Sequence, residues 1–248
     1  MRIVTWNVER PKLKSLKNKK RINYLLGLAP DLVILTETSL AVDLGSEFSG
    51  FFTQPSPRKP GPGEAVAAIL VRNSRFKVLQ QLETTDPREA ICIEIESDLG
   101  RITVYGSIIP YHNYRGPEGK SVQWEEHKNA IAWHKQDWLN LRASFPQHEM
   151  ITAGDYNQTR SGVGGYGTSG VRQLLSEALS VASLQCVTEE DFTATKKLSR
   201  HSIDHICLSP QLAAAVSEVD VWEGTLEGIR LSDHNGVIVD LGSSFLGG

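Results

Sequence analysis

The sequence predicts an α/β fold in which much of the sheet is antiparallel. Short apolar runs that end in polar residues, such as Ile3–Trp6, indicate buried strands. Apolar stripes at helical spacing, as over residues 22–29 and 124–145, indicate helices between some of these strands. Strand patterns also follow one another without a helix between them, so a simple strand–helix–strand repeat is excluded. These consecutive patterns are Ala65–Val71, Phe76–Leu82, Ala90–Glu96 and Arg101–Ile109.

Length and composition predict one soluble domain over residues 1–248. A chain of 248 residues is near the upper limit for a single hydrophobic core, and 40% hydrophobic with 22% charged residues is ordinary for a globular protein. The formal charge of −3 argues against a protein that grips long nucleic acid by bulk electrostatics. A local basic cleft remains compatible with it.

Cysteine and hydropathy patterns predict a cytoplasmic protein without a membrane span, and a monomer is favoured. Cys92, Cys186 and Cys207 are odd in number and lack metal-binding spacing, which argues against a disulfide framework or a zinc site. The chain starts with a strand pattern rather than a signal peptide. No apolar run approaches the roughly 18 residues that a spanning helix needs.

The first two predicted strands end in polar residues that could carry chemistry. Ile3–Trp6 leads to Asn7, and the apolar run after Asp31 leads to Glu37. Burying an unpaired glutamate costs several kcal/mol, so Glu37 must be solvated, paired or bound to a cation. Between them lies a basic run, Arg10–Arg21, which is either a solvated helix face or a positive rim that attracts a polyanion.

The middle of the chain predicts a hairpin, a polar loop and a long helix. The turn at Ser97–Gly100 joins two strands, and the loop Pro110–Lys120 is rich in polar and aromatic side chains. A helix is expected from Ser121 to about Ser144. Its apolar stripe includes His127 and His134, and histidines in such positions are usually structural. Only His127, near the helix start, is placed to reach a cleft.

The stretch Met150–Arg160 predicts a strand followed by a functional turn. Gly154 ends the apolar run and lets the backbone turn, and Asp155 and Asn157 then project from the carboxyl end of the strand. A carboxylate beside an amide suits phosphate-ester chemistry, although Gly-Asp-x-Asn is also a common turn composition. The glycines of Ser161–Gly170 predict a loop without the lysine of a P-loop. A helix over Val171–Leu179 follows.

The last two motifs complete a set of polar residues at strand edges. Ser202–Ser209 is a predicted strand with Asp204 and His205 on opposite faces, and Asp233 and His234 precede the final strand. Their recurrence at strand ends predicts one site. A set rich in carboxylates, with asparagine and histidine but no cysteine, suits Mg²⁺ or Mn²⁺ better than zinc.

With these motifs the chain resembles the endonuclease/exonuclease/phosphatase superfamily, which includes deoxyribonuclease I and the abasic-site endonucleases. The resemblance covers nearly the whole chain, in matching order and spacing. It implies a four-layer α/β sandwich of two mixed sheets packed face to face, with helices outside and the site at one edge. The motifs are Thr5–Asn7, Leu35–Glu37, Gly154–Asn157, Ser202–His205 and Ser232–His234.

The resemblance also implies a role for each site residue. Glu37 is expected to be the main metal ligand, assisted by Asn7 and Asp233. His234 is expected at the scissile phosphate as general base or oxyanion donor, with Asp204 orienting its ring. Asp155 would activate or position the attacking water, and Asn157 would bind a phosphate oxygen.

Relatives commonly carry a histidine or tyrosine at the strand end where this chain has Ser107 and Ile108. Tyr111, His112 or His127 could take its place. A softer departure is at Glu37, before which relatives often have a glutamine. We expect substrate contacts from Asn157 and from residues of the loop and the start of the helix, namely Tyr111, His112, Arg115 and His127.

The expected function is hydrolysis of a phosphodiester by direct attack of water, with DNA or RNA favoured as substrate. The basic run and the aromatic loop residues, which could stack on bases, favour a nuclease. One alternative is a phosphatase or phosphodiesterase acting on a phospholipid, an inositol phosphate or a nucleotide. The other is a catalytically inactive member that binds nucleic acid or protein, for which the missing strand-end residue is the sequence argument.

Overall fold

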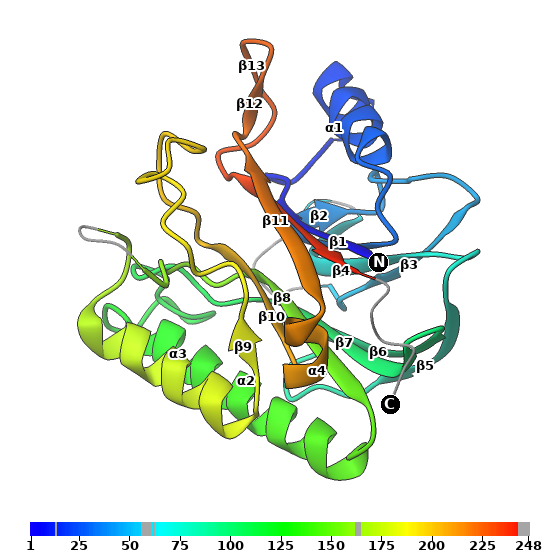
Figure 1. Cartoon of the computed structure of the whole chain (residues 1–248). Helices are drawn as coiled ribbons and strands as arrows, with labels where there is room; N and C mark the ends of the chain where they lie inside the picture. The colour runs from blue at the N-terminus through cyan, green and yellow to red at the C-terminus, as the bar shows by residue number, and fades with distance from the viewer. Residues whose placement is uncertain (13, 56–60, 62, 162–164, 243–248) are drawn as a thin grey trace.

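In the computed structural model, which describes residues 1–12, 14–55, 61, 63–161 and 165–242, two six-stranded sheets pack face to face (Figure 1). The first contains β1 (Arg2–Asn7), β2 (Leu32–Ser39), β3 (Phe48–Phe52), β4 (Glu64–Arg72), β11 (Val216–Trp222) and β14 (Gly236–Leu241). The second contains β5 (Lys77–Leu82), β6 (Ala90–Ser97), β7 (Gly100–Ile108), β8 (Glu149–Asp155), β9 (Gln185–Cys186) and β10 (Asp204–Leu208). The hairpin of β12 (Thr225–Leu226) and β13 (Ile229–Arg230) is separate from both.

Both sheets are mixed, which confirms the predicted sheet type. Their strand orders are β11-β14-β1-β2-β4-β3 and β5-β6-β7-β8-β10-β9. In each sheet one inner pair is parallel, β1 with β2 and β7 with β8, and the other pairs are antiparallel. The carboxyl ends of the parallel strands therefore lie at one edge of each sheet.

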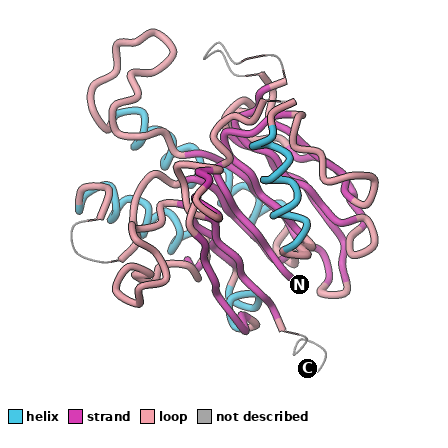
Figure 2. Tube along the Cα trace, turned by 90° about the horizontal axis from the view of Figure 1, so that it is seen from above, coloured by secondary structure: helices cyan, strands magenta, loops and turns pink. Residues whose placement is uncertain are grey.

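Helices cover the outer faces, so the four-layer sandwich is confirmed. They are α1 (Leu16–Gly27), α2 (Glu125–Ser144), α3 (Ser169–Val181) and the short α4 (Pro210–Ala214). α1 packs Leu25 against Trp6 and Leu35 of the first sheet, and in the view from above it lies over these strands (Figure 2). α2 and α3 cover the second sheet (Figure 1). Trp138 and Leu175 of these helices pack beside Tyr105.

The core between the sheets is almost entirely aliphatic. Its buried side chains come from both sheets and include Ile34, Ile69, Ile91, Val104 and Ile206. Burial of apolar surface stabilises the folded state by roughly 25 cal/mol per Å², but this interaction has no preferred direction. Polar contacts at the sheet edge must therefore supply the positional precision of a site.

Several element boundaries differ from those expected. α2 begins at Glu125 rather than Ser121, because Trp124 has a left-handed backbone (φ 68°) and its N–H donates to His112 O at 2.9 Å. The strand at Ser202 starts as β10 only at Asp204, and α3 extends beyond Val171–Leu179 at both ends. Prolines and glycines predict a surface loop at residues 53–63. This stretch lies mostly outside the described residues, as do residues 162–164 of the glycine-rich loop.

The four consecutive strand patterns do not form one meander. β4 belongs to the first sheet, whereas β5, β6 and β7 belong to the second, so the chain crosses between the sheets after Arg72. β11 gave no strand pattern because it is an edge strand with exposed polar residues, Ser217, Glu218 and Asp220. Within the described residues, no helix is long and apolar enough to cross a membrane.

Gly154 marks a close approach between β7 and β8. Its backbone φ is +142°, and a Cβ built there would lie 2.0 Å from the carbonyl oxygen of Ser107, its register partner. Only glycine tolerates both the dihedral angle and the contact. The residue is thus required by the backbone one position before Asp155.

We expect Gly154→Ala to lower the free energy of unfolding by roughly 3 kcal/mol or more, since it combines backbone strain with a steric clash. Gly100→Ala is the matched control, because Gly100 also has positive φ (+92°) but has no neighbouring atom within 4 Å of a built Cβ. The control should lose only about 1 kcal/mol. Urea titrations measure both variants, and equal losses would show that the Ser107 contact is unimportant.

Candidate active site

The buried carboxylate of Asp155 joins the two sheets at their common edge. Asp155 ends β8 with no solvent exposure, and its Oδ2 accepts from Asn7 Nδ2 of β1 at 3.0 Å. Asn157 Nδ2 donates to the same oxygen at 3.1 Å, and the Asn157 N–H donates to Oδ1 at 3.0 Å. Residues separated by about 150 positions therefore meet at one carboxylate.

An aspartate–histidine pair lies beside this carboxylate. His234 Nδ1 is 2.7 Å from Asp204 Oδ2, and Asp204 is the register partner of Asp155 across β8 and β10. His234 Nε2 then lies 3.8 Å from Asp155 Oδ2 and 3.4 Å from Asn7 Nδ2. The Asp204 contact fixes the ring so that Nε2 faces the cluster.

Backbone contacts hold the segment that carries His234. Ser232 Oγ donates to Asn7 O at 2.6 Å and accepts from the His234 N–H at 3.0 Å. Trp6 Nε1 donates to His234 O at 3.1 Å. The Ser-Asp-His motif is thus attached to the end of β1 through its serine.

Burial and charge give the two titrating groups unusual pKa values. Burial raises the pKa of Asp155 to about 7, against the opposing charge of His234. Burial lowers the pKa of His234, but the carboxylates of Asp204 and Asp155 outweigh it and raise that pKa to about 10. The imidazole is therefore held as a cation between two acids.

Glu37 lies in β2, two residues before the strand ends, close to Asn7 of β1. Asn7 pairs with Thr36 in the parallel register, so Glu37 is the next residue along, with φ +43°. Arg10 Nε lies 3.2 Å from its carboxylate, and the Arg10 N–H donates to Glu37 O at 2.6 Å. The side chain is about one-third exposed and can exchange this exposed arginine for another cation.

The donor set fits a hard divalent cation. Oxygen and nitrogen atoms of Asp155, Asp204 and His234 lie within 4.8 Å of one another. Buried Asp204 Oδ1 has no hydrogen-bond partner among the described residues, so an acceptor there awaits a cation or a donor. Glu37 and Asp233, the ligands expected from the sequence, are not in this group: Glu37 pairs with Arg10, and Asp233, about half exposed, lies 3.7 Å from Arg230. Oxygen-rich sets of this kind suit Mg²⁺ or Mn²⁺.

The loop after β7 brings His112 to Tyr166 of the glycine-rich segment. His112 Nδ1 is hydrogen-bonded to the Tyr166 hydroxyl, which also accepts from the His112 N–H at 3.2 Å. Burial raises the pKa of Tyr166, and the charge of Asp155 adds to the rise. Tyr166 is thus electrostatically linked to the cluster.

The other three residues expected to bind substrate differ in their exposure and in their hydrogen bonds. Tyr111 is half exposed, and Arg115 is exposed with Nη1 donating to Ser121 O at 3.1 Å. His127 is only 1% exposed, donates from Nδ1 to Pro110 O at 2.8 Å and has Gln158 Nε2 3.2 Å from Nε2. Both ring nitrogens of His127 are engaged within the protein, which leaves none for a substrate.

A sequence profile described as the Endonuclease/Exonuclease/phosphatase family matches residues 4–234. The chain belongs to this family. No curated protein sequence matches it significantly.

Solved structures of the family share the fold at low sequence identity. The 3′ phosphatase NExo from Neisseria, bound to a product DNA hairpin, is 18% identical with a TM-score of 0.68, over 98% of this chain and 99% of that one. The endonuclease domain of TRAS1, a telomere-specific non-LTR retrotransposon, is 15% identical with a TM-score of 0.65, over 97% of each. The human Nocturnin catalytic domain is 18% identical with a TM-score of 0.64, over 98% and 94%.

Three residues near the site of this family member were not among those expected from the sequence. Tyr166 was part of a loop without assigned chemistry. Arg200 donates to Asp233 O, and Arg230 lies 2.9 Å from Glu9 and 3.7 Å from Asp233. Arg200 lies in a loop and Arg230 in the two-residue strand β13, and neither segment has a periodic pattern. Only their proximity to motif residues in the sequence could have pointed to them.

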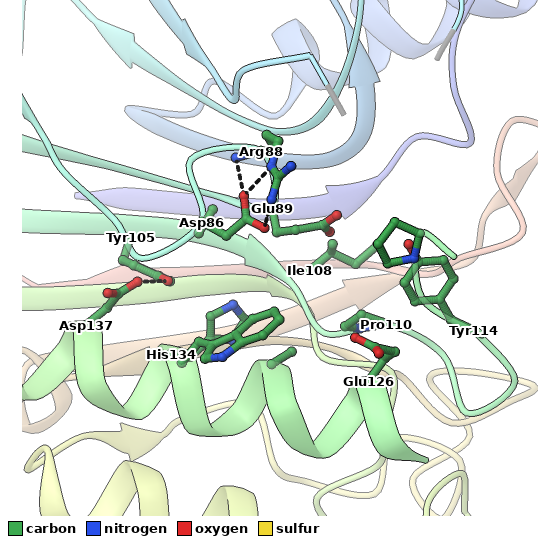
Figure 3. A pocket seen from close by; sticks show the side chains of 14 residues that line it. Asp86, Arg88, Glu89, Tyr105, Ile108, Pro110, Tyr114, Glu126, His134 and Asp137 are labelled. Atoms are coloured by element: carbon green, nitrogen blue, oxygen red, sulfur yellow. Dashed lines mark hydrogen bonds and ion pairs between the residues drawn. The ribbon is translucent and has the colours of Figure 1, made fainter. Parts of the chain in front are cut away.

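A separate cavity of about 100 Å³ lies between the end of β7 and α2 (Figure 3). Asp137 closes one side, where it accepts from Tyr105 Oη at 2.7 Å and from the Thr85 hydroxyl. The lining contains four acidic side chains and one arginine, which does not suit a phosphate. The four are Asp86, Glu89, Glu126 and Asp137.

His134 lines this cavity, and its protonation opposes folding. It is 3% exposed, and burial lowers its pKa to about 3, with a smaller effect from His127. The unfolded chain takes up a proton below the ordinary pKa of about 6.5, whereas the folded chain does not. The stability contributed by the neutral ring is complete above that value and falls as the pH drops toward 3.

We expect the titration of His134 to lower the free energy of unfolding by about 2 kcal/mol when the pH drops from about 8 to about 5. His134→Phe keeps a planar ring beside Trp138 and removes the titration. Urea titrations at both pH values should therefore show a smaller pH loss for the variant than for wild type. Parallel losses in the two proteins would contradict a neutral His134 in the fold.

Proposed function

We propose that this chain hydrolyses phosphodiester bonds of DNA or RNA by direct attack of water, with Mg²⁺ or Mn²⁺ as cofactor. The observation that supports this most is the convergence of Asn7, Asp155, Asn157, Asp204 and His234 at one edge of the two sheets. A scaffold has no structural need for two buried carboxylates beside an imidazole. The cluster suits an anionic centre with a water next to it.

Glu37 and Asn7 would hold the metal ion, with Asp233 as a third ligand. When bound, the ion supplies charge neutralisation at the phosphoryl oxygens. Arg10 now pairs with Glu37 and would turn to the substrate when that carboxylate is occupied. Asn7 Oδ1 already accepts from the Glu9 N–H at 3.0 Å and keeps a second lone pair for a ligand.

The remaining cluster residues divide the proton chemistry between them. Asp155, whose pKa lies near neutrality, takes the proton of the attacking water as its oxygen bonds to phosphorus. His234, held as a cation by Asp204, donates from Nε2 to a phosphoryl oxygen. Of the two roles expected for His234, the geometry and charge favour the oxyanion donor. Asn157 reaches a phosphate oxygen by releasing its bond to Asp155.

The leaving oxygen needs a proton source in place of the missing strand-end residue. Ser107 is fully buried and Ile108 is apolar, so neither can serve. The His112–Tyr166 pair offers a hydroxyl beside an imidazole and is our choice for this role. His127 positions the loop after β7 through Pro110.

Nucleic acid is the proposed substrate class because exposed cations lie beside motif residues. Arg10 pairs with Glu37, and Arg200 and Arg230 lie at Asp233. Lys12 and Lys14 follow Arg10 in the sequence and are exposed as well. Arg21, by contrast, is buried and donates from Nε to Leu231 O at 2.7 Å. Two of the similar structures are a DNA-bound 3′ phosphatase and a retrotransposon endonuclease, which is consistent with this choice.

We further propose a single-domain monomer that works in a reducing compartment such as the cytoplasm. All three cysteines are free thiols. Both sheets share one aliphatic core.

Glu37→Gln should raise the Mg²⁺ concentration for half-maximal activity and lower the rate, because it removes one ligand charge. Glu47→Gln is the matched control, since Glu47 also pairs with an arginine (Arg72, 2.9 Å) but on β3's side of the sheet.

His234→Ala should lower kcat by roughly 10²–10⁴-fold. Full activity of folded His234→Ala, or undiminished hydrolysis in excess EDTA, would refute the mechanism.

Lys12→Glu/Lys14→Glu should raise KM for DNA or RNA and flatten its dependence on salt, by about one unit of log–log slope per lost phosphate contact. Lys77→Glu/Lys128→Glu makes the same charge change at exposed positions on β5 and α2. A panel of single- and double-stranded DNA, RNA, nucleotides, sphingomyelin and inositol phosphates provides the substrates. Turnover of the last three with no nucleic-acid cleavage would assign the chain to the phosphatase alternative.

A further inference from the structure

Cys186 and Cys207 face each other across β9 and β10. They are register partners, so their side chains lie on the same face of the second sheet. The neighbouring pair is hydrogen-bonded, with the Val187 N–H donating to Ile206 O at 3.1 Å, so the two cysteines occupy a non-hydrogen-bonded position. Cα atoms in such positions are about 4.5 Å apart, within the range that a disulfide spans.

The two thiols differ in their access to solvent. Cys207 is fully buried in the cluster beneath α3. Cys186 is half-buried and lines a surface cavity of about 550 Å³ together with Arg160 and Glu189. A small solute can therefore reach Cys186 from the cavity but must pass it to reach Cys207.

The surroundings of Cys186 favour its thiolate. His205 Nδ1 lies 3.7 Å from Cys186 Sγ, while His205 Nε2 donates to Gln158 O at 2.9 Å. The Cys207 thiol, then the His205 ring and Arg160, lower the pKa of Cys186 well below its usual range against the effect of burial. Burial raises the pKa of Cys207. One partner is thus a nucleophile and the other a protonated thiol.

We propose that Cys186 and Cys207 form a peroxide-sensitive dithiol in which Cys186 is oxidised first and Cys207 then closes a cross-strand disulfide. The Cys186 thiolate attacks hydrogen peroxide, an S–O bond forms, the O–O bond breaks, and the released hydroxide takes a proton to become water. The Cys207 sulfur, losing its proton, then attacks the Cys186 sulfur. The S–O bond breaks, the S–S bond forms and a second water leaves.

This site is distinct from the carboxylate cluster. Asp204 and His205 are adjacent on β10 but point to opposite faces, as expected from the sequence, with Asp204 at His234 and His205 at Cys186. Peroxide has no part in ester hydrolysis, so the proposal stands whether or not the chain is a nuclease. A cellular reductant would return the pair to thiols.

The test is made on the reduced full chain. Pulsed iodoacetamide labelling over a range of pH, followed by peptide mass spectrometry, should show Cys186 reacting at least ten-fold faster than Cys92 or Cys207 at neutral pH. Limited hydrogen peroxide should then remove two hydrogen atoms from the intact mass. Digestion should yield Cys186 and Cys207 in one linked peptide pair that dithiothreitol separates.

Three variants, each checked for folding by circular dichroism, separate the steps. Cys207→Ser should stop at a sulfenic acid on Cys186 that dimedone traps, whereas Cys186→Ser should leave Cys207 unoxidised. Cys92→Ser, at an equally buried cysteine of β6, should still form the disulfide. The proposal is overturned if folded wild type labels Cys186 no faster than Cys92. It is also overturned if peroxide oxidises Cys186 without linking it to Cys207.

Discussion

The arrangement of the candidate site depends on the hydrogen bonds of the buried Asp155 carboxylate. A fully buried carboxylate costs several kcal/mol unless donors surround it. Here the donors come from Asn7 on the first sheet and from Asn157 just past β8, with His234 3.8 Å away. The aliphatic core between the sheets would allow small displacements of one sheet against the other. The hydrogen bonds of Asp155 do not, so they set the relative position of the two edges.

Two residues that flank this contact have left-handed backbones. Glu37 has φ +43° and Asn157 has φ +46°, and such values are uncommon outside glycine. Asn157 follows the end of β8, whereas Glu37 lies within β2, two residues before that strand ends. Neighbouring contacts, such as the Arg10 N–H to Glu37 O, offset the backbone cost. Part of the backbone strain of the chain is therefore located where the chemistry is proposed.

Most of the fold and the central residues of the candidate site could be predicted from the sequence, because both produce local sequence patterns. The apolar runs that lead to Asn7, Glu37 and Asp155, and the strand that begins at Asp204, can be recognised without knowing the topology. The arginines beside Asp233 could not be predicted in this way. Arg200 lies in an aperiodic loop and Arg230 in the two-residue strand β13, and their position beside Asp233 follows from how these segments pack.

Helical and strand periodicity was similarly informative only where one face is buried. The stripe of α2 correctly contained His127 and His134 as buried residues, but the helix start was displaced by the tertiary bond between Trp124 and His112. The edge strand β11 was missed since its alternation is weak. The composition does not indicate that the chain crosses from the first sheet to the second between β4 and β5, because both strands have ordinary length and polarity.

The place of β1 in the first sheet, between β2 and β14, has a consequence for synthesis. During translation β1 emerges before β14 and before the histidine of the cluster, both of which are made more than two hundred residues later. A ribosome-bound chain lacking that segment has neither a closed sheet nor an imidazole against Asp155. The proposed activity would thus be absent from any chain that is interrupted before β14.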